Sequence, residues 1–282
     1  MMGIKRFILR IRLFLSTFLI RRSVPNTRGS FTKMTNTILC VKWGDKYDRT
    51  YVEKLREQVE RHCSIPYKFY CLTDDPQWSY DIPLSNEWDK HENGNFWAYR
   101  KLFMFNYTAV KPSIGSTYYG HRILGDKFLY LDLDVIIHQD LKYFFELPMD
   151  KPYIVRGWWN DMEECHKNYA KFRSTPINSS VIRWDKGQLD EVFYHIKKHI
   201  DVIFFTYPTI DNYLNHFWYD MHFGKDSYFD VFPKGDIYSW YKGNIFPTDM
   251  ESRKIREKCK VCLFNNSAEM DDVSEIKSLW NT

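Results

Sequence analysis

The sequence predicts an α/β fold with one mainly parallel central sheet. Three observations lead to this expectation: a strand–helix–strand unit opens the folded part, a very apolar strand lies in mid-chain, and further strand and helix patterns alternate after it. With 282 residues, 44% of them hydrophobic, the chain is long enough to bury the core of one large domain.

The opening unit begins with Thr37–Trp43 (TILCVKW), whose β-branched and apolar residues indicate a strand. Thr50 and Glu53 have the spacing of a capping box, so a helix is expected from there to Cys63, with apolar residues on one face. Lys68–Leu72 then reads as a second strand. A strand, a helix and a strand at this spacing predict a parallel pair.

The rest of the chain alternates in the same way, with loops expected over 77–95 and 108–126. The remaining predicted elements are helices over 96–107, 188–199 and 209–218 and strands over 127–137, 177–184 and 228–232.

The strand expected over 127–137 contains two acidic residues among apolar ones (FLYLDLDVII from Phe128). Asp132 and Asp134 are two positions apart, so in a strand they point to the same side. Two close carboxylates repel each other, and an unpaired buried charge costs several kcal/mol. A divalent cation with oxygen ligands is the natural partner. The alternatives are that both aspartates pair with Lys or Arg, or that the strand ends early and they are solvated.

Several segments, taken in order, resemble the GT-A glycosyltransferases, in particular the glycogenin-like, retaining branch of bacterial and viral type. The segments that carry the resemblance are 38–47 (ILCVKWGDKY), 67–75 (YKFYCLTDD), 97–102 (WAYRKL), 129–134 (LYLDLD), 177–182 (INSSVI), Asp211-Asn212, 232–235 (FPKG) and 239–242 (SWYK). The resemblance spans about Thr37 to Trp280. It implies a GT-A, Rossmann-like single domain over 35–282, preceded by a basic, apolar segment and linker over 1–34.

The resemblance implies a metal site that holds Mn²⁺ or Mg²⁺ through Asp132 and Asp134, the family's DxD pair. Asp132 would also contact the donor. The family places a third ligand, a histidine, in a Phe-His-Gly turn near the C-terminus. The matching stretch here is Phe264-Asn265-Asn266, so Asn265 would offer a carbonyl oxygen instead.

The resemblance also implies donor-binding and catalytic residues. Donor binding would involve Lys101, Lys242, Trp43 and Tyr47, and catalysis would involve Asp211 and Asn178 at the reacting sugar. Each has a plainer interpretation. The lysines suit a solvated surface, the two aromatic residues suit a core, Asn178 suits a hydrogen-bonded core amide, and Asp211 suits the start of a helix.

The function implied is transfer of a hexose from a nucleotide sugar, expected to be a UDP-sugar, to a glycan, a lipid-linked acceptor or another hydroxyl. Two alternatives stay open. One is an inactive, transferase-like protein that binds carbohydrate or nucleotide. The other is a DxD phosphotransferase or phosphatase, although such enzymes place the motif on the first strand of the domain.

The charge is divided unevenly along the chain. Residues 1–34 hold eight Lys or Arg and no acid, which leaves 32 basic and 36 acidic residues in the remainder. A slightly acidic folded part makes nucleic acid an unexpected partner. Drawn as a helix, residues 4–22 place Arg6, Arg10, Thr17 and Arg21 on one narrow stripe, which is typical of a helix lying on an anionic membrane surface. A signal anchor, a targeting peptide or a start at Met34 are the alternatives.

The cysteines and histidines indicate no second metal site. Cys259 and Cys262 form one CxxC without a second ligand pair, and Cys40 and Cys71 are expected to be buried free thiols. A reducing, cytoplasmic location follows, with possible membrane association through the N-terminus. Five histidines form no ligand-spaced set and are expected to be exposed or loosely packed (His62, His138, His195, His199 and His216).

Overall fold

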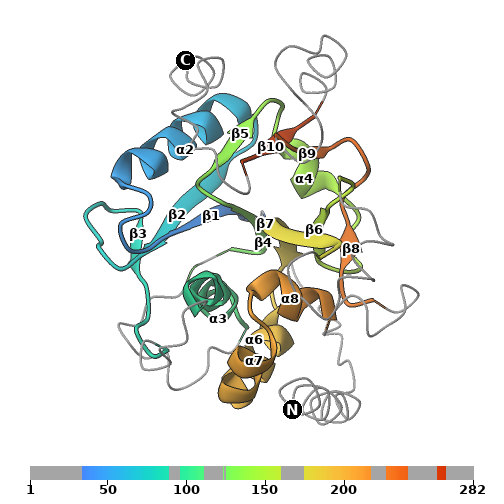
Figure 1. The fold of residues 1–282 in the computed structure, drawn as a ribbon. Coiled ribbons are helices and arrows are strands. Elements are labelled where there is room, and N and C mark those ends of the chain that lie inside the picture. The colour runs from blue at the N-terminus through green and yellow to red at the C-terminus, as the bar shows by residue number, and fades with distance from the viewer. Residues whose placement is uncertain are drawn as a thin grey trace.

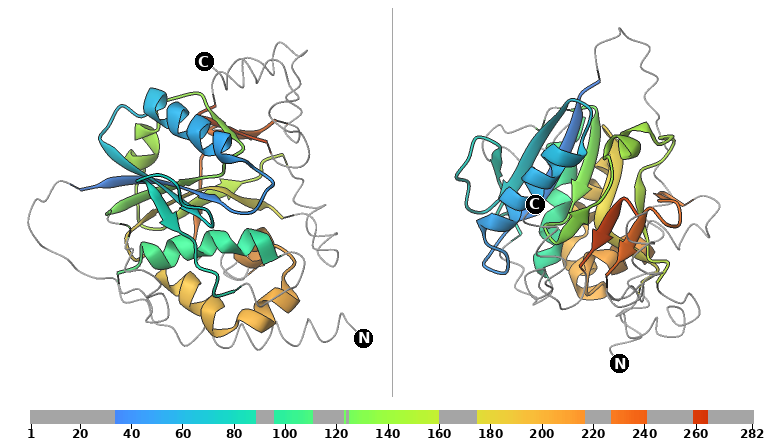
Figure 2. Two further views of the ribbon diagram at one scale, coloured as in Figure 1. Left: turned by 90° about the vertical axis from the view of Figure 1, so that its left-hand side faces the viewer. Right: turned by 90° about the horizontal axis from the view of Figure 1, so that it is seen from above.

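A computed structural model describes residues 34–88, 96–110, 123, 125–159, 175–216, 227–240 and 259–264. The described chain forms three layers, with a central sheet between helix α2 on one side and helices α3, α6, α7 and α8 on the other (Figures 1 and 2). The strands are β1 (Asn36–Lys42), β2 (Tyr67–Thr73), β3 (Asp81–Pro83), β4 (Lys127–Leu131), β5 (Val135–Ile137), β6 (Tyr153–Arg156), β7 (Ile177–Asp185), β8 (Asp230–Val231), β9 (Ile237–Ser239) and β10 (Val261–Leu263). The helices are α2 (Arg49–His62), a 3₁₀ helix η1 (Phe96–Leu102), α3 (Phe103–Tyr107), α4 (Lys142–Glu146), α6 (Asp190–Lys198), α7 (Ile200–Thr206) and α8 (Ile210–Leu214).

The central sheet has seven strands in the order β3-β2-β1-β4-β7-β6-β8. Strand β1 is parallel to both of its neighbours, β2 and β4, as the opening strand–helix–strand unit predicts. Strand β7 is the exception, because it runs antiparallel to β4 and β6. The chain moves from β1 outward to β2 and β3, then returns to place β4 on the other side of β1. The point where the order reverses therefore lies between β1 and β4.

Alternate residues of the central strands pack into two separate cores. Leu39 and Tyr130 belong to the core under α3, α6, α7 and α8, whereas Ile38 and Leu129 belong to the core under α2. Because successive side chains of a strand point to opposite faces, this alternation shows that β1 and β4 are covered on both sides. The predicted buried thiols fit this arrangement, since Cys40 and Cys71 are both 0% exposed.

The prediction of a single strand over 127–137 is wrong, because the structure has two strands there. Strand β4 ends at Leu131, and β5 begins at Val135 and belongs to a second, three-stranded sheet with β10 and β9. The intervening stretch contains Asp132 and Asp134. The chain leaves the central sheet there, so the two carboxylates lie at the end of a strand rather than inside one.

Other boundaries also differ from the expectation. Helix α2 begins at Arg49, because the carboxylate of Asp48 accepts the Thr50 N–H at 2.9 Å and caps the helix in place of the predicted capping box. Short strands and helices occur where none was predicted: β3 lies in a predicted loop, and α4, α7, β6, β9 and β10 were not anticipated.

The histidine expectation is wrong for His195 and His216, which are 4% and 3% exposed. His195 lies 2.9 Å from the Tyr213 hydroxyl, and burial, followed by nearby His199 and Lys198, lowers its pKa to about 3.

The N-terminal segment 1–33 lies outside the described residues, and so does the predicted membrane contact over 4–22. Within the described part of the chain, no helix has the length and apolar character needed to cross a membrane.

Candidate active site

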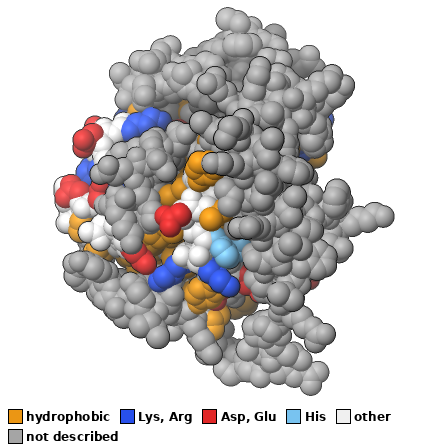
Figure 3. Space-filling view, turned by 60° about the horizontal axis from the view of Figure 1, so that its bottom comes forward, with side chains coloured by type: hydrophobic (Ala, Val, Ile, Leu, Met, Phe, Trp, Pro, Cys, Tyr) orange, Lys and Arg blue, Asp and Glu red, His pale blue; other side chains and the backbone are white. Residues whose placement is uncertain are grey.

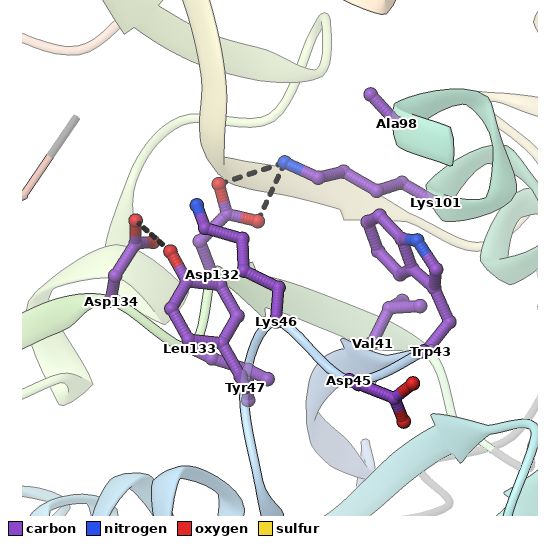
Figure 4. Close-up of a pocket in the computed structure, with 11 residues that line it drawn as sticks. Val41, Trp43, Asp45, Lys46, Tyr47, Ala98, Lys101, Asp132, Leu133 and Asp134 are labelled. Carbon is purple, nitrogen blue, oxygen red and sulfur yellow. Dashed lines mark hydrogen bonds and ion pairs between the residues drawn. The ribbon is translucent and has the colours of Figure 1, made fainter. Parts of the chain in front are cut away.

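A cavity of about 580 Å³ opens where β1 and β4 end, beside the reversal of strand order. Ligands of open α/β sheets bind at this position, because the loops that leave the two strands diverge and expose their backbone ends. The volume is in the range of small-molecule sites. The cavity is lined by Val41, Trp43, Gly44, Asp45, Lys46, Tyr47, Ala98, Lys101, Asp132, Leu133 and Asp134 (Figure 4).

One wall of the cavity is the β1–α2 loop, residues 43–48. Five successive residues of this loop, Trp43 to Tyr47, line the cavity. The two predicted aromatic contacts, Trp43 and Tyr47, are therefore both at the site and only half-buried. In the close-up, both side chains extend from the same loop, with Tyr47 beside Asp134 and Trp43 on the side of Lys101 (Figure 4).

Asp132 is held by a bidentate ion pair with Lys101. The Lys101 ammonium lies 2.6 Å from Oδ1 and 2.7 Å from Oδ2 of Asp132, and the Tyr130 hydroxyl also donates to Oδ1. Burial disfavours the charge on Lys101, but the Asp132 carboxylate outweighs it, so the pKa of Lys101 is raised. Strand alternation explains the pairing, because Asp132 follows Tyr130 by two positions and so faces the layer that contains η1.

Asp134 has a weaker partner. The Tyr47 hydroxyl donates to Oδ2 of Asp134 at 2.9 Å. Lys46 lines the same cavity wall as Tyr47, but its ammonium lies farther from the Asp134 carboxylate. Burial and then the charge of Asp132 raise the pKa of Asp134 to about 6, although Tyr47, Lys101 and Lys46 act in the opposite direction. A carboxylate in this state attracts a further positive charge.

The backbone around Asp134 is fixed from two sides. Gln58 of α2, 1% exposed, accepts the Ile137 N–H at 2.8 Å and donates to the Val135 carbonyl at 3.3 Å. The Phe264 N–H, at the end of β10, donates to the Asp134 carbonyl at 3.0 Å. These contacts tie the strand that follows Asp134 to both α2 and β10.

The two predicted catalytic residues lie together beside this centre. Asp211, near the start of α8, accepts the Ser179 N–H at 3.0 Å and the Asn178 side-chain N–H at 3.4 Å. Asn178 in turn accepts the Ser180 N–H, and the Ser180 carbonyl accepts the Asp132 N–H at 2.8 Å. Burial raises the pKa of Asp211, against the effects of Lys101 and the Ser179 contacts.

The structure thus brings together most of the site residues predicted from sequence. Asp132, Asp134, Lys101, Trp43 and Tyr47 line the cavity, and Asn178 and Asp211 form the adjoining pair. Lys242 and Asn265 lie outside the described residues. The described chain ends one residue before Asn265.

Three further residues at the site were not predicted from the sequence: Asp45, Lys46 and Tyr130. Lys46 lines the cavity, and its ammonium lies 4.5 Å from the centre of the Tyr47 ring. The signal for it was available, since Lys46 lies inside segment 38–47, one of those that carry the family resemblance. Tyr130 had no comparable signal, because an aromatic residue in an apolar strand resembles any other core residue.

The donor set fits a hard divalent cation at Asp134. Its carboxylate faces the cavity, its charge is incompletely balanced, and carboxylate oxygens suit Mg²⁺ and Mn²⁺. Asp132 is a less available ligand than the sequence indicated, because Lys101 already engages both of its oxygens. Among the described residues, no three His, Cys, Asp or Glu side chains gather to hold a metal.

On the face shown in Figure 3, the described surface is chemically mixed. Hydrophobic side chains lie next to acidic, basic and histidine side chains in the space-filling view (Figure 3).

Comparison of the sequence with protein-family models and with curated proteins gave no match. Comparison of the structure with solved structures gave glycosyltransferases. One is a glycosyltransferase involved in glycosylation of the major capsid of PBCV-1, with a TM-score of 0.54, 15% identity, and coverage of 86% of this chain and 99% of that chain. The galactosyltransferase LgtC, in complex with donor and acceptor sugar analogues, has a TM-score of 0.54, 13% identity, and coverage of 87% and 95%.

The bifunctional glycosyltransferase WbbM has a TM-score of 0.55, 11% identity, and coverage of 89% of this chain. The present chain spans 50% of the WbbM chain. At identities this low, structural likeness establishes a fold and not an activity. The described chain has the GT-A, Rossmann-like α/β fold found in these glycosyltransferases.

Proposed function

We propose that the protein is a glycosyltransferase that transfers a sugar from a nucleotide-sugar donor to a hydroxyl acceptor with the help of Mn²⁺ or Mg²⁺. One observation carries the proposal: Asp132 and Asp134 line a single cavity at the reversal of strand order, together with Lys101 and the β1–α2 loop. The GT-A fold supports this interpretation by analogy.

The order of the side chains along the sheet edge suggests how a donor would lie. The β1–α2 loop presents Trp43 and Tyr47 at one end, Asp132 and Asp134 follow β4, and Asn178 lies on the neighbouring β7. A nucleotide sugar has the same order of parts: base, diphosphate and sugar. In this arrangement the aromatic residues flank the base, and Asn178 with Asp211 hydrogen-bonds the sugar hydroxyls.

Breaking the bond between the sugar and the diphosphate leaves additional negative charge on the nucleoside diphosphate. Lys101 and Lys46 place fixed positive charge where that charge develops. Asp134, with Asp132, would hold the cation, which supplies further positive charge to the leaving group when bound. Through that cation, the same carboxylates would orient the diphosphate relative to the sugar, which would lower the entropy cost of reaching the reactive geometry.

The finer assignment is also part of the proposal. A UDP-hexose donor, a retaining outcome and membership of the glycogenin-like branch rest on the sequence motifs. A glycan acceptor is supported by LgtC, whose structure contains donor and acceptor sugar analogues. A lipid-linked acceptor rests on the sequence alone.

The domain division and the location rest on the sequence as well. Residues 35–282 would form the transferase domain, and residues 1–34 would form a segment that holds it at the cytoplasmic surface of a membrane.

A donor panel tests the proposal. Purified protein is incubated with UDP-sugars and GDP-sugars, with Mn²⁺, Mg²⁺ or EDTA, and nucleotide release is measured. We expect release with at least one donor, lost in EDTA and reduced by roughly 100-fold or more in Asp134→Asn, since this variant lacks the carboxylate that would hold the cation at the leaving group.

Asp75→Asn is the matched control, because Asp75 is an exposed carboxylate in a loop outside the cavity. It should retain the activity of the unmodified protein. Equal nucleotide release by Asp134→Asn and the unmodified protein, or no release with any donor, would contradict the proposed function.

A further inference from the structure

The β1–α2 loop turns sharply at Gly44. Gly44 has φ +58°, in the left-handed region, where a side chain costs roughly 1–2 kcal/mol. A Cβ added there would meet nothing within 4 Å, so only the backbone conformation, not a steric contact, favours glycine. The turn directs the following residues of the loop toward the cavity.

Both polar backbone groups of Gly44 are held by side chains, one from the last residue of β1 and one from the residue that follows β2. The Gly44 N–H donates to Oδ2 of Asp74 at 2.8 Å, and the Gly44 carbonyl accepts from the Lys42 ammonium at 2.9 Å. Lys42 and Asp74 are themselves 4.0 Å apart. These three residues form what we call the Gly44 clamp.

The topology explains why the clamp forms. Lys42 ends β1, and its register partner Thr73 ends β2, so Asp74 follows at the same edge of the sheet. Neither Lys42 nor Asp74 lines the cavity, and Lys42 is 8% exposed. Their contacts are instead with the backbone of Gly44 and with each other.

The other end of the loop is anchored separately. Asp48 caps α2, and Tyr47 is bonded to Asp134 and packs on Tyr51, with ring centres 4.7 Å apart. Between Trp43 and Tyr47, Gly44 is the residue with the freest backbone. Without the clamp, the position of Trp43, Asp45 and Lys46 would depend on that single turn.

We propose that Asp74 and Lys42 are positioning residues that hold the β1–α2 loop in the shape that receives the nucleotide of the donor. The inference rests on the proposed function. A loop that is ordered before binding loses less conformational freedom when the ligand arrives, so the clamp strengthens binding. It does not touch the reacting bond, so the rate of transfer at saturating donor depends little on it.

The first test needs no ligand. Hydrogen exchange of the Gly44 amide is measured at single-residue resolution in the unmodified protein, Asp74→Ala, Asp74→Asn and Asp75→Ala. Since Asp74 accepts this N–H, we expect exchange to be roughly tenfold faster in Asp74→Ala. Asp75→Ala, which changes the adjacent exposed carboxylate, should leave it unchanged. Unchanged exchange in Asp74→Ala would overturn the clamp.

The second test measures nucleotide binding by calorimetry, with UDP and GDP as probes in the presence of MnCl₂. Asp74→Ala and Lys42→Met should weaken binding by roughly tenfold, the effect of losing one charge-assisted hydrogen bond. Asp74→Asn keeps an acceptor oxygen for the Gly44 N–H and should recover part of the affinity. With a donor that turns over, KM should rise while kcat stays within about twofold.

The outcomes separate the two ideas. If the unmodified protein binds neither nucleotide, the proposed function fails and this inference fails with it. If the unmodified protein binds and Asp74→Ala binds equally well, or if kcat falls in place of a rise in KM, the positioning role alone is overturned. Thermal unfolding of each variant checks that a loss of binding is not a loss of folded protein.

Discussion

Asp132 and Asp134 are two residues apart, yet their charges are balanced very differently. Asp132 has an ammonium against both oxygens, whereas Asp134 has one neutral hydroxyl within hydrogen-bond distance. The pKa of Asp134 is therefore raised by burial and by its neighbour to about 6. The cation that we propose would therefore gain most from Asp134.

This imbalance predicts how stability depends on pH. The pKa of Asp134 is about 6 in the folded protein and 3.8 ordinarily, so the protonated form favours folding. That contribution is fully present below pH 3.8 and is lost as the pH rises through 6. The Asn side chain cannot ionise, so Asp134→Asn should be more stable than the unmodified protein at pH 7.5 by about 1–2 kcal/mol. This is less than the full pKa shift would give, because Asp134 is only half-buried and solvent screens its charge.

Chemical unfolding in EDTA at pH 4.5, 6 and 7.5 checks the prediction, and the difference should shrink toward pH 4.5. Asp132→Asn is the informative comparison. It leaves the buried Lys101 without its partner, so at pH 7.5 it should destabilise the protein. A gain from Asp134→Asn that does not change with pH would contradict the assigned cause.

At the scale of residues, sequence reasoning found the acidic pair but not its partners. The pair stands out because charge in an apolar run is costly. The contacts of Asp132 with Lys101 and of Asp134 with Tyr47 join residues 31 and 87 positions apart, and nothing local in the sequence encodes them. The family resemblance named these partners as donor contacts, so it placed them at the site without showing that they also hold the aspartates.

Among the elements, the division of β4 from β5 shapes the site most directly. A single long strand would have kept both aspartates inside the central sheet. Instead, β5 pairs with β10 in the second sheet, and Gln58 on α2 supplies the hydrogen bonds that a neighbouring strand would otherwise make on that side of β5. The buried amide of Gln58 thus fixes the direction of the chain immediately after Asp134.

Removing that amide should disturb both stability and the site. Gln58→Leu leaves the Ile137 N–H and the Val135 carbonyl without this partner, which should cost about 1–3 kcal/mol in the free energy of unfolding. Because β5 begins directly after Asp134, affinity for Mn²⁺ with UDP should also fall, measured by calorimetry well below the melting temperature.

Glu57→Ala serves as the control, since Glu57 is the exposed neighbour of Gln58 on the same helix. It should change neither quantity appreciably. If Gln58→Leu lowers stability but binds Mn²⁺ and UDP normally, Gln58 supports the fold without positioning Asp134.

Elements with a strong local pattern were predictable, and short ones were not. The strands from Asn36 and Ile177 are nearly continuous buried runs of seven and nine residues, and the helix from Arg49 repeats its buried residues at helical spacing. Strands β3, β5, β9 and β10 have three residues each, too few for a period to show. They exist because distant strands or Gln58 satisfy their backbone groups, which is a property of the folded molecule.

In the whole molecule, the order of the strands determines where chemistry can occur. The βαβ unit made a parallel pair predictable, and the fold class followed from the alternation of elements. The antiparallel direction of β7 was not predictable, because the segment before it gives no pattern and strand direction depends on how the intervening chain returns. The resemblance nevertheless named Asn178, on β7, and Asp211 as site residues, and the structure places the two together beside the cavity.

The uneven charge of the chain leads to a prediction for the full-length protein. Residues 1–34 hold eight Lys or Arg and no acid, while the remainder is slightly acidic, so electrostatic attraction to anionic lipid should depend on the N-terminal segment. Each basic residue near such a surface contributes about 1 kcal/mol, so replacing Arg6, Arg10 and Arg21 by Gln should weaken binding to phosphatidylserine vesicles by roughly 100-fold at low salt.

A matched triple replacement by Gln of exposed lysines in the folded part, at Lys68, Lys186 and Lys234, removes the same charge and should have little effect. Vesicle sedimentation measures both variants; equal losses would show that overall charge, and not an amphipathic N-terminal helix, governs any attraction to the membrane.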